Sequence, residues 1–426
     1  MSCSCWYYLL TWYFCRRIEG ELIANSVAVV HLTNATSGRR SARDVKSAHY
    51  YWTSDKNGAP SAIFDAKLFD HDIVEHRRMT PDSSKAAEGV SPQYRFWPYS
   101  GITIFSAPSP ATGPRTTTNT RVVVIGQLVE SIRWDMNAGG GTGAADMIQR
   151  AAGSLSFREV ASVGVLVSRP YDPPDMWMQS STALRLPSQW KGKGTFRWIA
   201  LAVASGRPYA SEDDMLYVMG VYDAQGAVRN TSGSTSMLAE SNLFDIFAVS
   251  RTQQLQVVGC VRVRDLLDGK LGHFELLVSS DRLGTSSTVS SFVPLVQLEE
   301  QGLTSEAVAI LPGVVSEASL HFDGWTKRWV VVSLAVSDYT HRVCFSADSS
   351  LTSHWQCISV GGIGAPWSDK HRYITYAGRA HPELDSLRGE ARVISFATNL
   401  LTTPSDLFLQ ENKYAYCPLF LEYTIS

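Results

Sequence analysis

Two glutamates and a histidine are the residues best suited to acid–base chemistry in this sequence of 426 residues. Glu317 precedes a strand-like run, and Glu383 follows His381 and a proline. Cleavage of a glycosidic bond needs a carboxylic acid to protonate the leaving oxygen and a carboxylate as base or nucleophile. Glu317 and Glu383 could supply both groups, and His381 could tune one of them or bind a sugar hydroxyl. The three residues are therefore the candidate catalytic set.

Aromatic and polar residues near the start of other strand-like runs are candidates for substrate binding. They are Trp97, Ser100, Arg197, Trp198 and Tyr376. Tryptophan rings offer flat apolar faces on which sugar rings can stack. The alternative is that these side chains only hydrogen-bond neighbouring strands and solvate a central opening, and the sequence leaves both interpretations open.

Two other motifs have a plainer interpretation. The glycine-rich stretch 138–144 resembles a phosphate-binding loop, but no lysine follows it and a flexible linker is favoured. The acidic and histidine residues between Asp65 and His76 are of metal-ligand types, yet nothing in their spacing makes them converge, and a solvated loop is favoured. No CxxC pair occurs, so a structural zinc site is not expected. We predict neither a metal nor a cofactor.

The elements that must position these residues are predominantly β-strands. Short runs rich in Val, Ile, Phe and Tyr alternate with clusters of Gly, Ser, Pro, Asp and Asn, and helical periodicity is confined to 145–152 and 263–267. Surface loops are expected at 65–92, 133–156 and 281–305. The runs form groups that begin near Tyr99, Phe196, Val315 and Ala380, with an incomplete group before residue 55. This pattern predicts an all-β, five-bladed β-propeller, with a pair of β-sandwich domains as the competing fold.

In a propeller, the starts of the innermost strands surround one central funnel, so the candidate residues would converge there. The stretch Tyr376-Ala-Gly-Arg-Ala-His-Pro-Glu-Leu, followed by Arg392-Val-Ile-Ser-Phe, resembles the last blade of a family of five-bladed propellers. The family was long filed in bacteria as a domain of unknown function, and it is related to glycosidase-type propellers and endo-D-arabinofuranosidases. Weaker similarities lie around Asn25, Phe96, Ser316 and Tyr416. The resemblance implies a glycoside-hydrolase-like propeller that acts on or binds a furanose-containing or related glycan.

The N-terminal region departs from that family. Its first blade carries an aspartate, which is one of the catalytic carboxylates in related propeller glycosidases, but residues 1–22 contain no aspartate. We therefore expect a divergent or truncated strand region over 1–22, an incomplete first blade, and a single propeller domain over 23–426. The loss leaves open a non-catalytic propeller that binds carbohydrate or protein, or a structural subunit.

Composition narrows the partners and the compartment. The chain is 44% hydrophobic and 18% charged, and 38 basic residues nearly balance 40 acidic ones, which argues against a general nucleic-acid binder. The apolar run 6–15 is too short to span a bilayer, and arginines follow it rather than precede it, unlike a signal peptide. Secretion is expected only if an N-terminal segment is missing. Cys344 and Cys357 flank a predicted hairpin and could be bonded, but free buried thiols are favoured. The sequence does not indicate the oligomeric state.

Overall fold

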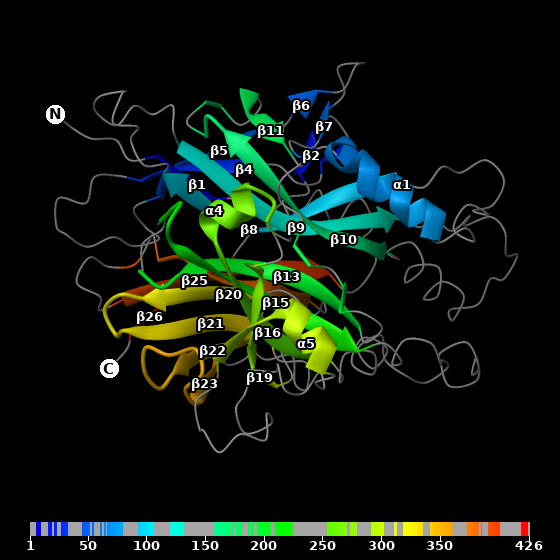
Figure 1. The fold of residues 1–426 in the computed structure, drawn as a ribbon. Helices are drawn as coiled ribbons and strands as arrows, with labels where there is room; N and C mark the ends of the chain where they lie inside the picture. The colour runs from blue at the N-terminus through cyan, green and yellow to red at the C-terminus, as the bar shows by residue number, and fades with distance from the viewer. Residues whose placement is uncertain are drawn as a thin grey trace, which may run out of the picture.

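The structure is a computed structural model in which β-strands predominate (Figure 1). It describes residues 6–9, 16–18, 21–23, 27–32, 45–51, 53–54, 60–61, 64, 66–79, 93–105, 120–131, 157–170, 172–173, 176–180, 186–187, 189–190, 194–205, 209–224, 254–270, 273–278, 291–301, 311–312, 318–334, 341–360, 373–382, 385, 391–400 and 419–424. The expectations for the glycine-rich stretch and the helix at 145–152 lie outside these residues.

The described strands form five sheets of three or more strands, here numbered I to V in chain order. Sheet I contains β1 (Trp6–Leu9), β4 (Val27–Leu32) and β5 (Val45–Tyr51). Sheet II contains β8 (Gln93–Phe105), β9 (Thr120–Ser131), β10 (Phe157–Ser168), β11 (Met178–Ser180) and β14 (Tyr209–Ser211). Sheet III contains β12 (Gln189–Trp190), β13 (Gly194–Val203), β15 (Met215–Ala224), β16 (Gln254–Arg262), β17 (Glu275–Val278), β18 (Ser291–Pro294) and β19 (Leu311–Pro312).

Sheets IV and V follow in the C-terminal part of the sequence. Sheet IV contains β20 (Ser319–Asp323), β21 (Arg328–Leu334), β22 (His341–Ser346) and β23 (Trp355–Val360). Sheet V contains β24 (Tyr373–Ala380), β25 (Ala391–Leu400) and β26 (Leu419–Thr424). Two short ribbons pair β2 (Arg16–Ile18) with β3 (Glu21–Ile23), and β6 (Thr53–Ser54) with β7 (Pro60–Ser61).

The sheets are arranged as in a propeller. Sheet IV is a four-stranded antiparallel meander in chain order, and β8–β11 and β24–β26 also pair in chain order. Strand β13 packs against β8 on one side and β20 on the other, and β20 in turn packs against β24 (Figure 1). Successive meanders whose first strands lie side by side are the defining feature of propellers. The all-β propeller prediction is confirmed on this topology.

The first strands of sheets IV and V run in the same direction, as in a propeller. The hydroxyl of Ser319, at the start of β20, accepts a hydrogen bond from the backbone N–H of Ala380 at 2.8 Å. Ala380 pairs with Ile394 across sheet V, and Arg392, two residues before Ile394 on β25, binds Asp323 at the end of β20. The end of β24 therefore lies beside the start of β20, and both strands point the same way.

Buried apolar residues fill the spaces between the sheets. One cluster joins sheets II and III, and its largest members include Trp198, Phe196 and Tyr222. A second cluster packs Trp329 and Val331 of sheet IV against sheet III, and a third packs sheet IV against sheet V around Val330. Successive residues of β21 face opposite clusters: Trp329 and Val331 belong to the second, and Val330 and Val332 to the third.

The helices correct two loop predictions. The segment predicted as a loop at 65–92 contains the 3-10 helix η2 (Ala66–Phe69) and α1 (Asp70–Met79), and the segment at 281–305 contains β18 and α5 (Leu295–Gln301). Phe69 of η2 and Ile73 of α1 pack against sheet II, whereas Val74 of α1 is exposed, so α1 presents only a weak apolar stripe. The expected helix at 263–267 is confirmed as α4 (Val263–Leu267).

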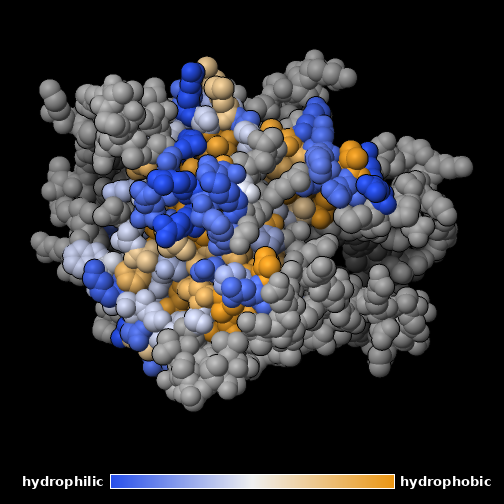
Figure 2. All heavy atoms as spheres, viewed as in Figure 1, coloured by the Kyte–Doolittle hydropathy of each residue, from blue (hydrophilic) through white to orange (hydrophobic). Residues whose placement is uncertain are grey.

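Charged side chains gather around α4. Figure 2 shows a hydrophilic area over this helix. Arg264 pairs with Asp213 at 2.7 Å, and Lys270 with Asp268 at 2.8 Å. The Lys270 ammonium group lowers the pKa of Asp268. These are exposed pairs, and the area is a solvated surface.

Cys344 and Cys357 form a disulfide, which corrects the expectation of free thiols. They lie directly opposite each other on β22 and β23. The pairing of β22 with β23 places the two cysteines opposite each other, as the predicted hairpin allowed. The prediction that both are free buried thiols is wrong. Cys260 is a free, buried thiol. Its pKa is raised to about 12, mainly by burial and to a smaller extent by the nearby carboxylate of Glu275.

Candidate functional site

A buried ion pair joins the last two sheets. Arg392, at the start of β25, donates hydrogen bonds from Nη2 and Nε to Asp323 Oδ2 at 2.6 and 3.2 Å. The two side chains are 2% and 3% exposed. Asp323 also accepts hydrogen bonds from the backbone N–H of Trp325 and the hydroxyl of Thr326, both at 2.9 Å. Its carboxylate is thus supplied with four donors.

These donors outweigh the effect of burial on Asp323. Burial by itself raises a carboxyl pKa, but the hydrogen bonds from Arg392, the Trp325 backbone and Thr326 favour the charged form, and the net pKa is lowered. Asp323 is therefore an ionised, fully engaged carboxylate. It holds a turn and a neighbouring sheet, and it is not a general acid.

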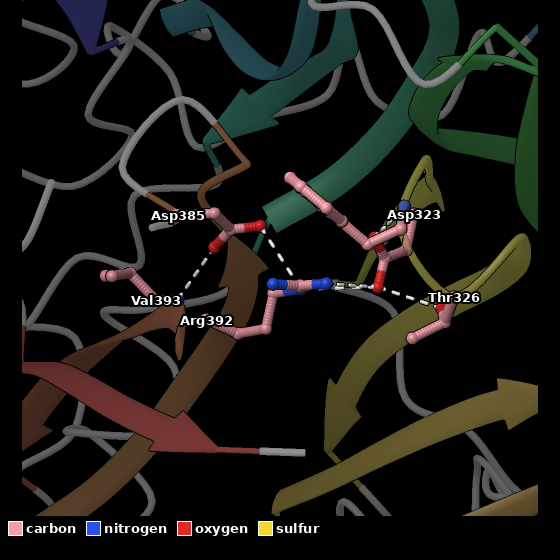
Figure 3. A network of polar contacts seen from close by, with 6 residues as sticks. Asp323, Thr326, Asp385, Arg392 and Val393 are labelled. Carbon is pink, nitrogen blue, oxygen red and sulfur yellow. Dashed lines mark hydrogen bonds and ion pairs between the residues drawn. The ribbon is translucent and has the colours of Figure 1, made fainter. Parts of the chain in front are cut away.

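A second carboxylate flanks the same arginine, as Figure 3 shows. Asp385 Oδ2 lies 3.5 Å from Arg392 Nε, and its Oδ1 accepts a hydrogen bond from the backbone N–H of Val393 at 2.9 Å. The pKa of the nearby Tyr423 is raised, mainly by burial and to a smaller extent by the negative charge of Asp385. We call Ser319, Asp323, Ala380, Asp385 and Arg392 the IV–V seam.

His381 belongs to the interior beside this seam. It is 1% exposed, its Nε2 lies 2.6 Å from the hydroxyl of Ser395, and its backbone N–H donates to Val393 O at 2.8 Å. The sequence placed His381 where the innermost strand of the last blade begins. The structure places it just after that strand ends, because β24 occupies Tyr373–Ala380. A side chain so enclosed holds β25 rather than meeting a ligand.

Three of the other candidates lie outside what the structure describes in full. Glu317 and Glu383 are not among the described residues, and Tyr376 is described only by its backbone position within β24. The nearest described residue in the sequence is Ala318 for Glu317 and Pro382 for Glu383. The catalytic pairing of the two glutamates therefore remains a prediction.

Two of the four candidates from sheets II and III, Trp198 and Ser100, are buried between those sheets. Trp198 has no exposed surface: it stacks on Phe196 with ring centroids 5.2 Å apart, and its indole N–H donates to Pro187 O at 2.6 Å. It therefore offers no face to a sugar, which corrects that expectation. The hydroxyl of Ser100 accepts a hydrogen bond from the backbone N–H of Leu201 across the two sheets, at 3.2 Å.

Trp97 and Arg197 are half-buried in β8 and β13. Strands β8 and β9 approach each other closely at Trp97. A Cβ built on Gly126 of β9 would lie 2.0 Å from the Trp97 carbonyl oxygen. A glycine is required there, where β8 carries an irregularity between Pro98 and Ser100. Of the four candidates, these two retain partly exposed side chains.

Helix α1 carries most of the acidic and histidine residues of the segment 65–76. Within the described part of the chain, no group of three or more His, Cys, Asp or Glu side chains is placed to hold a metal ion. His71 Nδ1 and Glu75 Oε2 are 3.9 Å apart on the exposed face of the helix. In the same described residues, no helix is both long and apolar enough to cross a membrane.

Sequence reasoning missed Asp323, Asp385 and Arg392 as a cluster. Asp323 and Arg392 are 69 residues apart in the sequence, and no local pattern links them. One signal was present: Asp323-Gly324 between two apolar runs is a strong hairpin motif, and it points to the turn that Asp323 holds.

The comparisons with known proteins add little to this geometry. No protein-family model matches the sequence, and the search of curated proteins found no similar sequence. A solved structure titled "Glycoside hydrolase" aligns with 82% of this chain and 78% of its own at 9% identity, with a TM-score of 0.34. Another, described as a BT0996 RGII complex, aligns over the same shares at 10% identity and a TM-score of 0.33. At such values neither likeness carries an argument, and the fold rests on the strand topology.

Proposed function

We propose that this chain is a five-bladed propeller that acts on a furanose-containing or related glycan, with Glu317 and Glu383 as its two carboxylates. The propeller domain would extend over 23–426, with sheets I to V as its blades. One glutamate would protonate the leaving oxygen, and the other would act as base or nucleophile. Trp97 and Arg197 would contact the substrate from the neighbouring blades.

One observation supports a site between sheets IV and V. The backbone N–H of Ala380 donates a hydrogen bond to the Ser319 hydroxyl at 2.8 Å, so the two sheets touch at these residues. Glu317 precedes Ser319 by two residues, and Glu383 follows Ala380 by three. Because β20 and β24 run in the same direction, the chain leaves this contact in opposite directions toward the two glutamates, and the separation of about 5–10 Å that glycosidases use would require both segments to turn toward each other.

The disulfide adds support of a different kind. Disulfides persist in oxidising compartments such as the periplasm and the cell exterior. Cys344 and Cys357 are bonded within sheet IV. A protein that acts on polymeric glycans would meet its substrate in such a compartment.

The test is release of reducing ends from a panel of arabinans and related furanose-containing glycans. The wild-type chain is expected to release reducing ends, and Glu317→Gln and Glu383→Gln are each expected to reduce the rate at least about a hundredfold, the lower range for loss of a general acid or base. Glu422→Gln is the matched control, because Glu422 is exposed on β26. Full activity in Glu317→Gln and Glu383→Gln would contradict the assignment.

A non-catalytic glycan-binding propeller is the second candidate, and the position of His381 favours it. This histidine would have been the third member of the catalytic set, but it is buried and bonded to Ser395. Glycan binding without any release of reducing ends would establish this candidate over the hydrolase.

A further inference from the structure

Strand β23 (Trp355–Val360) forms the outer edge of sheet IV, at the periphery of the molecule (Figure 1). It pairs with β22 in a regular antiparallel ladder that contains no bulge. Among the strands that the structure describes, β22 is its one partner. Residues 356–359 are all exposed, so this edge of the sheet is open to solvent.

The edge lacks the features that normally prevent an edge strand from pairing with another chain. Proteins protect such edges with charged side chains, proline, short strands or a covering element. The outermost strand of each other large sheet has such a feature: β5 contains Lys46, β11 has three residues, β18 ends at Pro294 and is followed by α5, and β26 contains the exposed Glu422. Strand β23 reads Trp-Gln-Cys-Ile-Ser-Val, with no charged residue, no proline and no bulge. It is therefore an unprotected edge.

The backbone groups that point outward from this edge follow from one contact. The N–H of Ala347 donates to His354 O at 2.7 Å, one position beyond the paired ends of β22 and β23. Hydrogen-bonded and non-hydrogen-bonded pairs alternate along an antiparallel ladder. Ile358, four residues beyond His354, therefore directs its backbone groups at β22. The N–H and C=O groups of Cys357 and Ser359 point away from the sheet.

Two further features prepare the edge for a partner strand. The Cys344–Cys357 disulfide cross-links β23 to β22, so the edge strand is held in place before a partner binds. Ile358 is 61% exposed. A single exposed isoleucine is ordinary on a protein surface, but this one lies between the two residues whose backbone groups point outward. A strand added beside β23 would satisfy those groups and cover the isoleucine together.

We propose that β23 pairs with β23 of a second copy of this chain, in antiparallel orientation about a two-fold axis at Ile358. With this axis, Cys357 lies opposite Ser359 of the partner subunit, and their outward backbone groups exchange hydrogen bonds. The two Ile358 side chains form a non-hydrogen-bonded pair, the kind in which side chains lie closest. A two-fold interface must be self-complementary, and an uncharged strand that pairs with itself brings no like charges together. This pairing is independent of any glycan.

The test is covalent capture of the dimer with purified full-length protein, because a contact of one strand per copy lies at the small end of interface sizes, where association is weak. Ile358→Cys places two thiols opposite each other on the axis, and oxidation with copper phenanthroline is expected to give a disulfide-linked dimer on non-reducing gels. Gln356→Cys is the matched control: with the same axis its two thiols would be separated by four residues along the strand, about 13 Å, and are expected not to cross-link.

A second variant measures the pairing without a new cysteine. Ile358→Lys places two ammonium groups opposite each other and is expected to raise the dissociation constant of the dimer at least about tenfold in sedimentation velocity. Because Ile358 is exposed, its urea unfolding midpoint should match that of the wild-type chain, which shows that the fold is retained.

The outcomes decide the proposal in either direction. Cross-linking at position 358 of both chains, confirmed by peptide mapping and absent from Gln356→Cys, would support it. Equal cross-linking of the two cysteine variants, or a dimer that persists unweakened in Ile358→Lys, would overturn it. A wild-type chain that stays monomeric at every concentration, with no cross-link in Ile358→Cys, would also overturn it and leave the edge to an extended segment of a different protein.

Discussion

Replacing Arg392 with methionine tests whether the buried ion pair holds sheets IV and V together. Methionine is similar in length to the arginine stem but supplies neither charge nor donors. Asp323 would lose its hydrogen bonds at 2.6 and 3.2 Å and keep those from the Trp325 backbone and Thr326. Hydrogen bonds to buried charged groups contribute about 1.5–3 kcal/mol each, and breaking a buried pair costs about 3–5 kcal/mol. Because two donors remain, we expect a loss near the lower end, about 3 kcal/mol.

The assay is urea unfolding at pH 7, with the free energy of unfolding obtained by linear extrapolation. The double variant Arg392→Met with Asp323→Asn should lose less than the sum of the single variants, because the orphaned charge has been removed. In the wild-type chain the lowered pKa of Asp323 stabilises the fold above the unfolded-state pKa, and this contribution is lost as the pH falls through the lower folded-state value. In Arg392→Met that dependence should weaken, because Asp323 no longer has its cationic partner. A loss below about 1 kcal/mol would refute the reasoning, since that is the worth of an ordinary neutral hydrogen bond.

Two further predictions concern sheet IV. Replacing Cys344 and Cys357 together by alanine removes the cross-link between residues with a sequence separation of 13. The free energy of unfolding, measured by urea titration, should decrease by about 3 kcal/mol. Wild-type stability in that variant would mean that the disulfide does not form. Burial lowers the pKa of His341 to about 4, whereas in the unfolded chain the pKa of histidine is about 6.5. The stability of the fold therefore shows no penalty from this residue above pH ~6.5, and it decreases as the pH falls from there toward the folded-state pKa. Unfolding measured between those limits should show a loss of about 3 kcal/mol that His341→Phe abolishes, and an equal pH dependence in His341→Phe would contradict this origin.

The strand content was predictable because each strand carries a local signal. Apolar runs rich in Val, Ile, Phe and Tyr alternate with turn residues, and β20 and β21 are two such runs joined by the turn 324–327. Helix α1 was missed because Ile73 is the one buried residue among its described side chains. The start of the last blade was misplaced because His381-Pro382 resembles the entry to a strand, whereas β24 ends just before it.

The site was less predictable, because its contacts depend on how distant sheets meet. Trp198 lies in the middle of β13, where Phe196 and Phe274 enclose it, whereas Trp325 lies in the turn between β20 and β21 and is exposed. The enclosure of Trp198 is completed by Phe274, which is 76 residues away in the sequence, and no local pattern records that contact. The pairing of Arg392 with Asp323 is likewise a consequence of sheets IV and V lying side by side.

The measurement that tests the central claim most directly is amide hydrogen exchange with and without the best-bound glycan. We predict slower exchange at the IV–V seam, in segments 319–328 and 380–395, and unchanged exchange in β9 of sheet II. Protection confined to other sheets, or no glycan that alters exchange anywhere, would contradict a glycan site at the meeting of sheets IV and V.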